Sequence, residues 1–232
     1  MGRKRAIGWR ARIAAALLLV ALAGGGWAWW HGQHWRPDPA AFPVQGVLVG
    51  SRDGRVDFNA LRATGASFAY LEASAGAAGR DPAFARNLRA ARGSGLSFGA
   101  VHAYDPCIAA EKQSANFMTI VPRDAGLLPP AIALVRTAEG CDPRVSEAAV
   151  ESELTTFLNQ VEGHVGQPAV LLVSRDFEQA YAISGRLERN LWLTRDWFQP
   201  DYAGRPWTLW TANSSYRSEA SDEPLRWVVL QP

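Results

Sequence analysis

The sequence is poor in cysteine, with only Cys107 and Cys141 in 232 residues. Neither belongs to a C-x-x-C or C-x-x-H pattern, which excludes the usual structural zinc sites. We therefore expect no metal site and no cofactor. In an oxidising compartment an even pair of cysteines most simply forms one disulfide, and two free buried thiols are the alternative.

Acidic residues are absent from the first 37 positions. Six of the 24 basic residues lie at or before Arg36, whereas all 22 acidic residues follow it. The remainder has 18 basic and 22 acidic residues, a net charge of about −4. It also lacks clusters of lysine and arginine, which neutralise phosphates in nucleic-acid binding proteins. We expect no nucleic-acid partner.

The basic N-terminus is followed by an apolar run over residues 13–30, which is 18 residues long. Its basic residues are Arg3, Lys4, Arg5, Arg10 and Arg12. This order is typical of an export signal whose positive flank stays in the cytoplasm. The run is at the short end for a bilayer core of about 30 Å. The charge asymmetry disfavours a buried core helix.

Two features of the apolar run favour different fates. Trp27, Trp29 and Trp30 at its far end are typical of an interfacial aromatic belt and favour an uncleaved signal-anchor. Ala21-Leu22-Ala23 is a possible signal-peptidase site. The first reading predicts a membrane-anchored domain in the periplasm or outside the cell, and the alternative predicts secretion after cleavage near Ala23.

The sequence predicts three segments. Residues 1–35 form a cytoplasmic basic tail plus a transmembrane signal-anchor, or a signal peptide; residues 36–43 form a short stiff linker; and residues 44–232 form one domain. We find no internal repeat or low-complexity tract.

Strands and helices are predicted to alternate along the domain. We expect strands at 44–49, 68–72, 96–102, 131–135 and 169–173, helices at 57–63, 81–93, 108–121, 150–165 and 176–183, and final strands at 191–193, 207–210 and 227–230. Five strand–helix units indicate an α/β fold with a parallel sheet. An open doubly wound sheet and a barrel both fit this pattern, and the three final strands favour the barrel.

Several segments carry a recognisable order of motifs. They are GVLVGSRDGRVDF at 46–58, FAYLEASAG at 68–76, DPAFARN at 81–87, GAVHAY at 99–104, QSANF at 113–117, LPP at 128–130 and WTLW at 207–210. In this order they resemble the family 25 glycoside hydrolases, the lysozymes of the N,O-diacetylmuramidase type. The resemblance implies an irregular TIM-like (β/α)5(β)3 barrel over residues 44–232, with a sugar site at the carboxyl ends of the strands. It also implies muramidase activity on peptidoglycan.

The acids that this family uses are missing. Glycoside hydrolysis needs a proton donor and a second carboxylate. The positions that the resemblance assigns to acids are Leu48, Ala133 and Val135, and residues 224–232 contain no acid near the end of the last strand. Alkyl side chains cannot transfer a proton. We expect a divergent member of the family with its catalytic acids replaced, and therefore no enzyme activity.

Other polar and aromatic residues remain at the predicted strand ends. Glu72 is a fallback acid, or else forms an ion pair with Arg136 or Arg175. The predicted substrate-binding residues are Glu72, His102, Tyr104, Arg136 and Trp210. The resemblance makes Tyr104 and Trp210 the best candidates for exposed sugar stacking, while a structural role is the alternative for His102.

The resemblance also places the two cysteines relative to the predicted strands. Cys107 follows the third predicted strand and Cys141 the fourth, so a disulfide would join adjacent loops at the site. The prediction is a tethered peptidoglycan-binding or glycan-binding scaffold that contacts the membrane through residues 13–30. The alternatives are an active muramidase with relocated acids, and a protein partner bound in the former active-site cleft.

Overall fold

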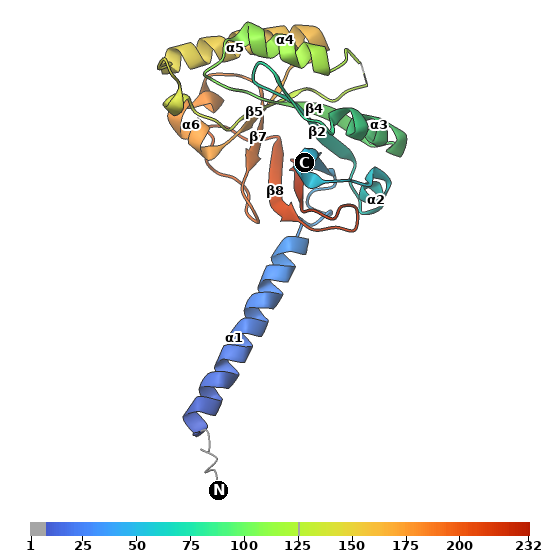
Figure 1. Ribbon diagram of the computed structural model, residues 1–232, viewed down its shortest axis with the longest axis vertical. Helices are drawn as coiled ribbons and strands as arrows, with labels where there is room; N and C mark the ends of the chain where they lie inside the picture. The colour runs from blue at the N-terminus through green and yellow to red at the C-terminus, as the bar shows by residue number, and fades with distance from the viewer. Residues whose placement is uncertain (1–7, 125) are drawn as a thin grey trace.

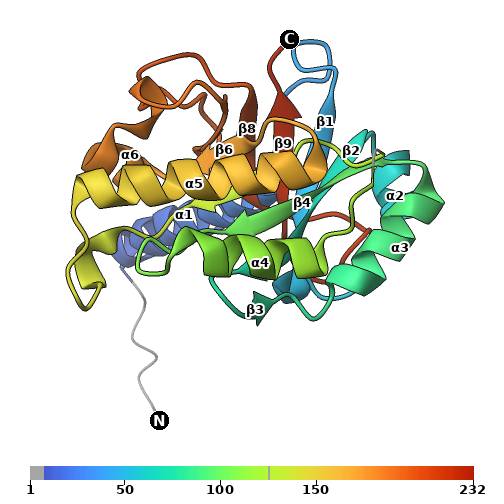
Figure 2. The ribbon, with the colours of Figure 1, turned by 90° about the horizontal axis from the view of Figure 1, so that it is seen from above.

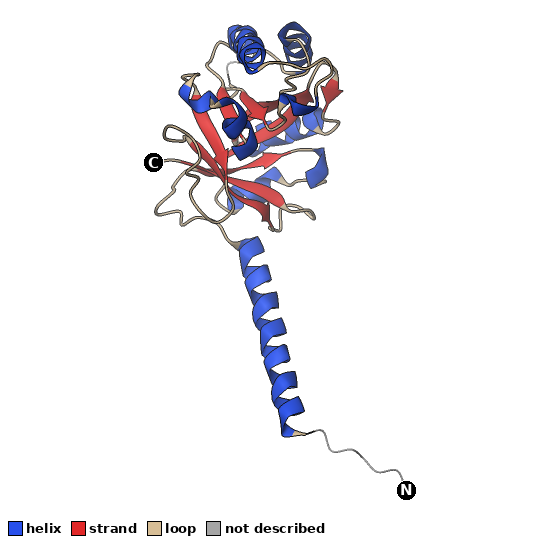
Figure 3. Cartoon of the chain, turned by 90° about the vertical axis from the view of Figure 1, so that its left-hand side faces the viewer, coloured by secondary structure: helices blue, strands red, loops and turns tan. Residues whose placement is uncertain are grey.

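The computed structural model describes residues 8–124 and 126–232, so Arg3, Lys4 and Arg5 lie outside the described residues. Its first element is one long helix, α1 (Trp9–His34), which projects from the rest of the chain (Figures 1 and 3). The predicted apolar run lies within it. Residues 12–34 are long and apolar enough to cross a membrane, by length and composition alone.

The remainder is built on a closed barrel of eight strands. They are β1 (Gln45–Val49), β2 (Phe68–Ala75), β4 (Ser97–Ala103), β5 (Ala131–Leu134), β6 (Val170–Val173), β7 (Asn190–Thr194), β8 (Leu209–Tyr216) and β9 (Leu225–Leu230). Their order is β1-β9-β8-β7-β6-β5-β4-β2, and pairing of β1 with β2 closes the ring. Only β9 runs antiparallel to its barrel neighbours. The barrel is thus confirmed over the open sheet.

A helix follows each of the first five barrel strands. These helices are α2 (Phe58–Ala63), α3 (Phe84–Ser94), α4 (Ala110–Ile120), α5 (Glu147–Val165) and α6 (Arg175–Tyr181). Short 3-10 turns occur at Ser51–Asp53, Ala138–Gly140 and Ile183–Gly185. Figure 2 shows α4 and α5 side by side over one face of the barrel. Hence the order of strands and helices agrees with the predicted one.

Two apolar layers explain why the strands lack polar alternation. One layer fills the barrel and includes Tyr70, Val101 and Trp192, while the larger one lies between the strands and the helices. Parallel strands that are buried on both faces need apolar residues at successive positions. Trp192 and Trp227 belong to these layers, and each indole N–H finds a buried side-chain acceptor.

Strand β8 differs most from its prediction. The expected strand was 207–210, but β8 begins at Leu209 and continues through a polar stretch to Tyr216. Its pairing with β9 shifts register on both sides of Asn213. These irregularities allow polar residues in the strand, which hydrophobicity alone does not reveal. The two-residue strand β3 (Gly79–Arg80), paired with the end of β2, was not predicted.

The segment between α1 and β1 is in contact with the barrel. Pro37 is buried, and the Gln45 amide donates hydrogen bonds to the carbonyls of Pro37 and Phe42. The Arg36 guanidinium donates to the Thr64 carbonyl and lies 5.2 Å from the centre of the Trp227 ring. The predicted linker 36–43 thus contacts the domain through Arg36, Pro37 and Phe42, whereas residues 38–41 are exposed.

Candidate functional site

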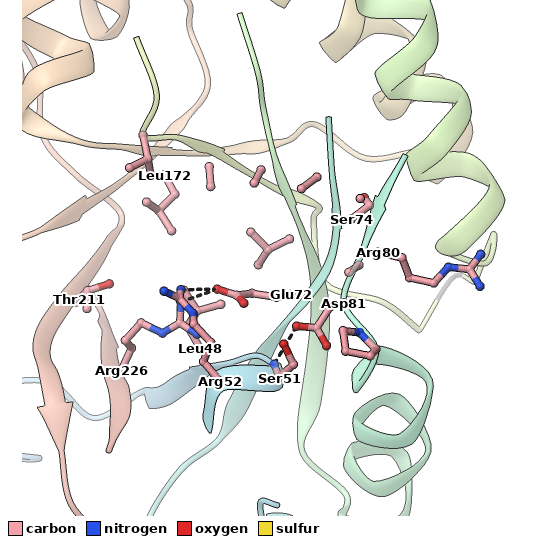
Figure 4. A pocket seen from close by; sticks show the side chains of 18 of the residues that line it. Leu48, Ser51, Arg52, Glu72, Ser74, Arg80, Asp81, Leu172, Thr211 and Arg226 are labelled. Atoms are coloured by element: carbon pink, nitrogen blue, oxygen red, sulfur yellow. Dashed lines mark hydrogen bonds and ion pairs between the residues drawn. The ribbon is translucent and has the colours of Figure 1, made fainter. Parts of the chain in front are cut away.

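A cleft of about 570 Å³ opens at the carboxyl ends of the parallel strands (Figure 4). Residues of several chemical types line it: charged Arg52, Glu72, Arg80, Asp81 and Arg226; hydroxyl-bearing Ser51, Ser74, Thr194, Thr211 and Ser214; and apolar Leu48, Val101, Ala133, Val135 and Leu172. Barrel enzymes place their chemistry at this end. The cleft is therefore the candidate site.

The three positions where acids were expected all border this cleft. Leu48 is buried in the barrel interior, Ala133 is half-buried on β5, and Val135 is 58% exposed just beyond that strand. The i, i+2 spacing turns Ala133 and Val135 to one side of the strand, as expected for a pair of flanking carboxylates. None of these three cleft positions carries a carboxylate.

A network of ion pairs also lies at the barrel mouth. Arg226 Nη1 donates to Glu72 Oε1 at 2.5 Å, and Nη2 donates to Asp53 Oδ2 at 3.0 Å. Arg52 Nη2 lies 3.5 Å from Glu72 Oε1. Burial acts to lower the pKa of Arg226, but the two carboxylates outweigh it and raise that pKa. One guanidinium therefore bridges two carboxylates at the barrel mouth.

Glu72 has a different partner from the ones we expected. Arg136 instead pairs with Asp105, and Arg175 lies 3.7 Å from Asp201. The pairing with Arg226 arises because β9 runs antiparallel beside β1, so its first residues lie at the mouth. Sequence order separates Glu72 from Arg226 by 154 positions, which conceals the contact.

The main chain of the loop after β1 packs closely against this network. The Gly50 amide donates to Asp53 Oδ2 at 2.6 Å. A Cβ atom on Gly50 would lie 2.0 Å from Glu72 Oε2, so any larger residue would displace the carboxylate. Asp53 and Arg226 were missed as site residues.

Asp81 is the other carboxylate among the lining residues. Its Oδ2 accepts a hydrogen bond from the Ser51 amide at 2.7 Å, and Oδ1 accepts one from the Ala83 amide at 2.7 Å. Figure 4 shows the first of these contacts beside the cleft. Asp81 therefore joins the turn after β1 to the beginning of α3. The helix was predicted to begin at residue 81, but α3 begins at Phe84.

His102 is buried and does not border the cleft. Its Nδ1 lies 2.8 Å from Ser74 Oγ, and its Nε2 lies 3.4 Å from Gln113 Oε1. Burial lowers the pKa of His102 to about 4, against a smaller opposing effect of the Gln113 hydrogen bond. These contacts are those of a structural histidine, which was the alternative to ligand binding.

The expectation that Tyr104 and Trp210 form exposed stacking faces is wrong. Each side chain is only 2% exposed. The Trp210 indole donates to the Arg195 carbonyl at 2.7 Å and packs against Phe42 and Trp207. Both side chains belong to the layer between strands and helices: Trp210 on β8 and Tyr104 just after β4 face away from the barrel interior.

The predicted disulfide is confirmed. Cys107 and Cys141 are bonded, with their Cα atoms 5.2 Å apart, and the bond joins the loops after β4 and β5. Arg136 lies near this junction and borders a shallow hollow beside the cleft. Within residues 8–124 and 126–232, no group of three or more histidine, cysteine or acidic residues could hold a metal ion.

Comparison with known proteins agrees with this geometry. A family 25 glycosyl hydrolase from Bacillus anthracis has 23% identity and a TM-score of 0.77, covering 86% of this chain and 93% of that one. A bacterial lysozyme from Streptomyces coelicolor has 19% identity and a TM-score of 0.72, covering 82% and 92%. Both likenesses concern the fold.

Curated sequences give a second line of similarity. An uncharacterized Escherichia coli O157:H7 protein, YegX, is 26% identical over 179 residues, which are 74% of this chain and 64% of that protein. The chain thus matches somewhat less than two thirds of this relative. The model of the glycosyl hydrolases family 25 matches residues 49–219, which include most of the barrel and its mouth. The chain belongs to glycosyl hydrolase family 25.

Proposed function

We propose that this chain is a lysozyme-like protein of the cell envelope that binds peptidoglycan or another glycan at its barrel mouth without hydrolysing it. The proposal rests on the hydrogen bonds that already engage the two carboxylates in the cleft. Glu72 is bonded to Arg226, and both oxygens of Asp81 accept main-chain hydrogen bonds. The positions expected to supply acids are the apolar Leu48, Ala133 and Val135.

Glycosidases need two carboxyl groups with different tasks. One gives a proton to the leaving oxygen, while the other acts as a base or nucleophile about 5–9.5 Å away. Glu72 is engaged by Arg226 and Asp81 holds the turn at Ser51, so catalysis by this pair would disturb two structural contacts. Two such rearrangements in one site argue against a relocated mechanism.

The cleft nevertheless keeps features that suit a glycan. Its hydroxyl groups at Thr194, Thr211 and Ser214 can exchange hydrogen bonds with sugar hydroxyls, and the exposed Arg52 and Arg80 can donate to them. None of the described residues lining the cleft is aromatic. Binding would therefore depend on hydrogen bonds, without the stacking that aromatic rings provide.

We further propose that α1 is a signal-anchor that tethers the barrel in the periplasm or outside the cell. A helix of 26 residues is about 39 Å long, which exceeds the bilayer core of about 30 Å. The candidate span has no buried residues in the chain, so it lacks the contacts of a soluble core helix. Cleavage near Ala23 and secretion is the alternative.

The decisive experiment combines turnover and binding. The full chain in detergent is incubated with purified peptidoglycan, and released reducing ends and retained protein are both measured, beside Glu72→Gln and a matched Glu139→Gln control at an exposed position. We expect no turnover in any variant and retention in all three. Turnover that disappears only in Glu72→Gln would establish an active muramidase and overturn the proposal.

A steric variant locates the binding. Ala103 is exposed at the end of β4 and borders the cleft, so Ala103→Trp should narrow the mouth without disturbing the core. We expect retention on peptidoglycan to fall at least about fivefold, a loss of roughly 1 kcal/mol. If the wild-type chain is not retained on any glycan, a protein partner at the apolar Val135 rim becomes the better explanation.

A further inference from the structure

The carboxyl end of α1 is fixed to the barrel by hydrogen bonds. Asn213 Nδ2 donates to the carbonyls of Gly32 and Trp35 at 2.9 and 2.8 Å. Trp197 Nε1 donates to the Gly32 carbonyl at 3.3 Å, and the main-chain N–H of Arg217 donates to Gln33 at 2.8 Å. The last carbonyls of a helix have no partner within it, so these donors complete the helix end.

This attachment lies at the same end of the barrel as the cleft. Asn213 is in the second half of β8, and Trp197 follows the end of β7. Thr194 and Ser214, each close to one of these residues in sequence, border the cleft. In Figure 1 the arrowhead of β8 lies beside the upper end of α1. Hence α1 leaves the barrel from the rim of its mouth.

Exposed aromatic residues gather around the same place. Trp197 and Phe198 are 51% and 63% exposed, although they belong to the barrel domain. Trp197 and Trp29 of α1 border one groove of about 420 Å³. Trp30, the next residue, is also exposed. Exposed aromatic side chains thus lie both at the helix end and in the β7–β8 loop.

The backbone at Trp197 is held in an unusual conformation. Its φ is +66°, in the left-handed region that large residues avoid. The Trp197 amide donates to the Ala212 carbonyl at 2.8 Å. Its ring covers Gly32 closely, since a Cβ atom added to Gly32 would lie 3.4 Å from the ring. A strained residue persists only where its surroundings fix it, and such residues concentrate at functional positions.

From these observations we propose that the loop 195–199 is a second membrane contact, whose occupant is the surface of a phospholipid bilayer. Tryptophan and phenylalanine partition to the headgroup region beside a spanning helix. The exposed Arg217 can reach lipid phosphates there, whereas Arg195, whose guanidinium lies 5.6 Å from the Phe198 ring, is paired with Asp201 at 2.9 Å. The barrel would then rest on the bilayer at the rim of its mouth. This inference depends on the proposed signal-anchor.

Site-directed spin labels test the contact in the full chain. Because Cys107 and Cys141 are bonded to each other, an introduced cysteine is a single labelling site. Phe198→Cys is labelled with a nitroxide in bilayer nanodiscs, and collisions with oxygen and with a water-soluble nickel chelate are compared. The matched control is Ser67→Cys, an exposed position at the opposite end of the barrel, just before β2.

We expect the ratio of oxygen to nickel accessibility to be at least about threefold higher at 198 than at 67, a free-energy difference of roughly 0.7 kcal/mol in partitioning. Equal ratios would overturn the contact. A third label, Leu19→Cys in α1, separates the two proposals. If the label at 19 is in lipid but that at 198 is not, the anchor stands and this inference fails; if neither is in lipid, both fail.

The unlabelled chain provides a measurement that needs no substitution. In nanodiscs that contain a lipid with a photoreactive group near the headgroup, mass spectrometry should locate adducts at residues 195–199 and none at residues 66–67. The opposite distribution, or adducts in α1 alone, would contradict the proposed contact. Neither the spin-label measurement nor the photolabelling depends on whether the protein binds glycan, so failure of glycan binding is distinguished from failure of this contact.

Discussion

Arg226 supplies the positive charge that pairs with two carboxylates at the barrel mouth. Its side chain is 19% exposed and bridges Glu72 and Asp53, so Arg226→Met would leave Asp53 without its cationic partner and Glu72 with only the exposed Arg52, 3.5 Å away. Removing one partner from a buried pair typically costs about 3–5 kcal/mol. We expect roughly 2–3 kcal/mol here because Glu72 keeps some solvent contact, measured as the change in the free energy of unfolding in urea.

The matched control for Arg226 is Arg92→Gln. Arg92 also pairs with a carboxylate, that of Asp124, but at an exposed position. Exposed pairs contribute little to stability because water screens them. Unchanged unfolding in Arg92→Gln beside a clear loss in Arg226→Met is the expected result. Equal effects would mean that the mouth network contributes no more than a surface pair.

His102 should make stability depend on pH. Its pKa falls from 6.5 to about 4 on folding because it is buried, so between these values the unfolded chain binds a proton that the folded chain does not. Stability from this group is complete above pH 6.5 and is lost as the pH falls toward 4, by about 3 kcal/mol.

Paired pH series measure the contribution of His102. Urea unfolding of the wild type and of His102→Gln is compared between pH 4 and pH 7. The difference in free energy of unfolding between the two proteins should shrink as the pH falls, since glutamine does not titrate. A constant difference across this range would show that His102 binds its proton equally well in the folded state.

Sequence motifs placed some residues at the cleft correctly and missed or misplaced others. Leu48, Ala133 and Val135, where acids were expected, all border the cleft, because neighbouring motif residues fix their register. Arg226 was missed because its carboxylate partners are 154 and 173 positions away. Tyr104 was misjudged, since a place near a strand end does not tell which side of the barrel a side chain faces.

At the scale of elements, the disulfide should stabilise the two loops that it joins. It closes a segment of 34 residues, for which the chain-entropy model gives roughly 3–4 kcal/mol. The Cys107→Ser, Cys141→Ser double variant should therefore unfold at lower urea concentration, and reduction of the wild type should have the same effect. If reduction leaves the unfolding midpoint unchanged, the loops are held by their packing alone.

Element order was predictable because the longer helices have an apolar stripe and the strands contain short apolar runs. Helix α5 is the clearest case, with Val150, Leu154 and Phe157 all buried at helical spacing. Element ends were less predictable where tertiary contacts set them. The polar half of β8 is a strand because β9 pairs with it, a condition that local sequence does not carry.

For the whole molecule, the signal-anchor predicts a chain that stays in the membrane. Alkaline carbonate should fail to extract the expressed protein from membranes, and its intact mass should include the N-terminal segment. The matched control is Ala21→Phe, which removes the small residue from the possible cleavage site and should leave the mass unchanged apart from the substitution itself. A mature chain that begins at Gly24 would contradict the anchor.

The hydrogen bonds from Asn213 to the end of α1, and the contacts of Arg36, Pro37 and Phe42 with the barrel, leave little free chain between helix and domain. If α1 spans a bilayer, the barrel cannot rise from the surface, and its search for ligand takes place in two dimensions. Occupancy of the mouth would then follow the surface density of glycan at the membrane, not its concentration in bulk. Only strands that approach the bilayer closely would be captured.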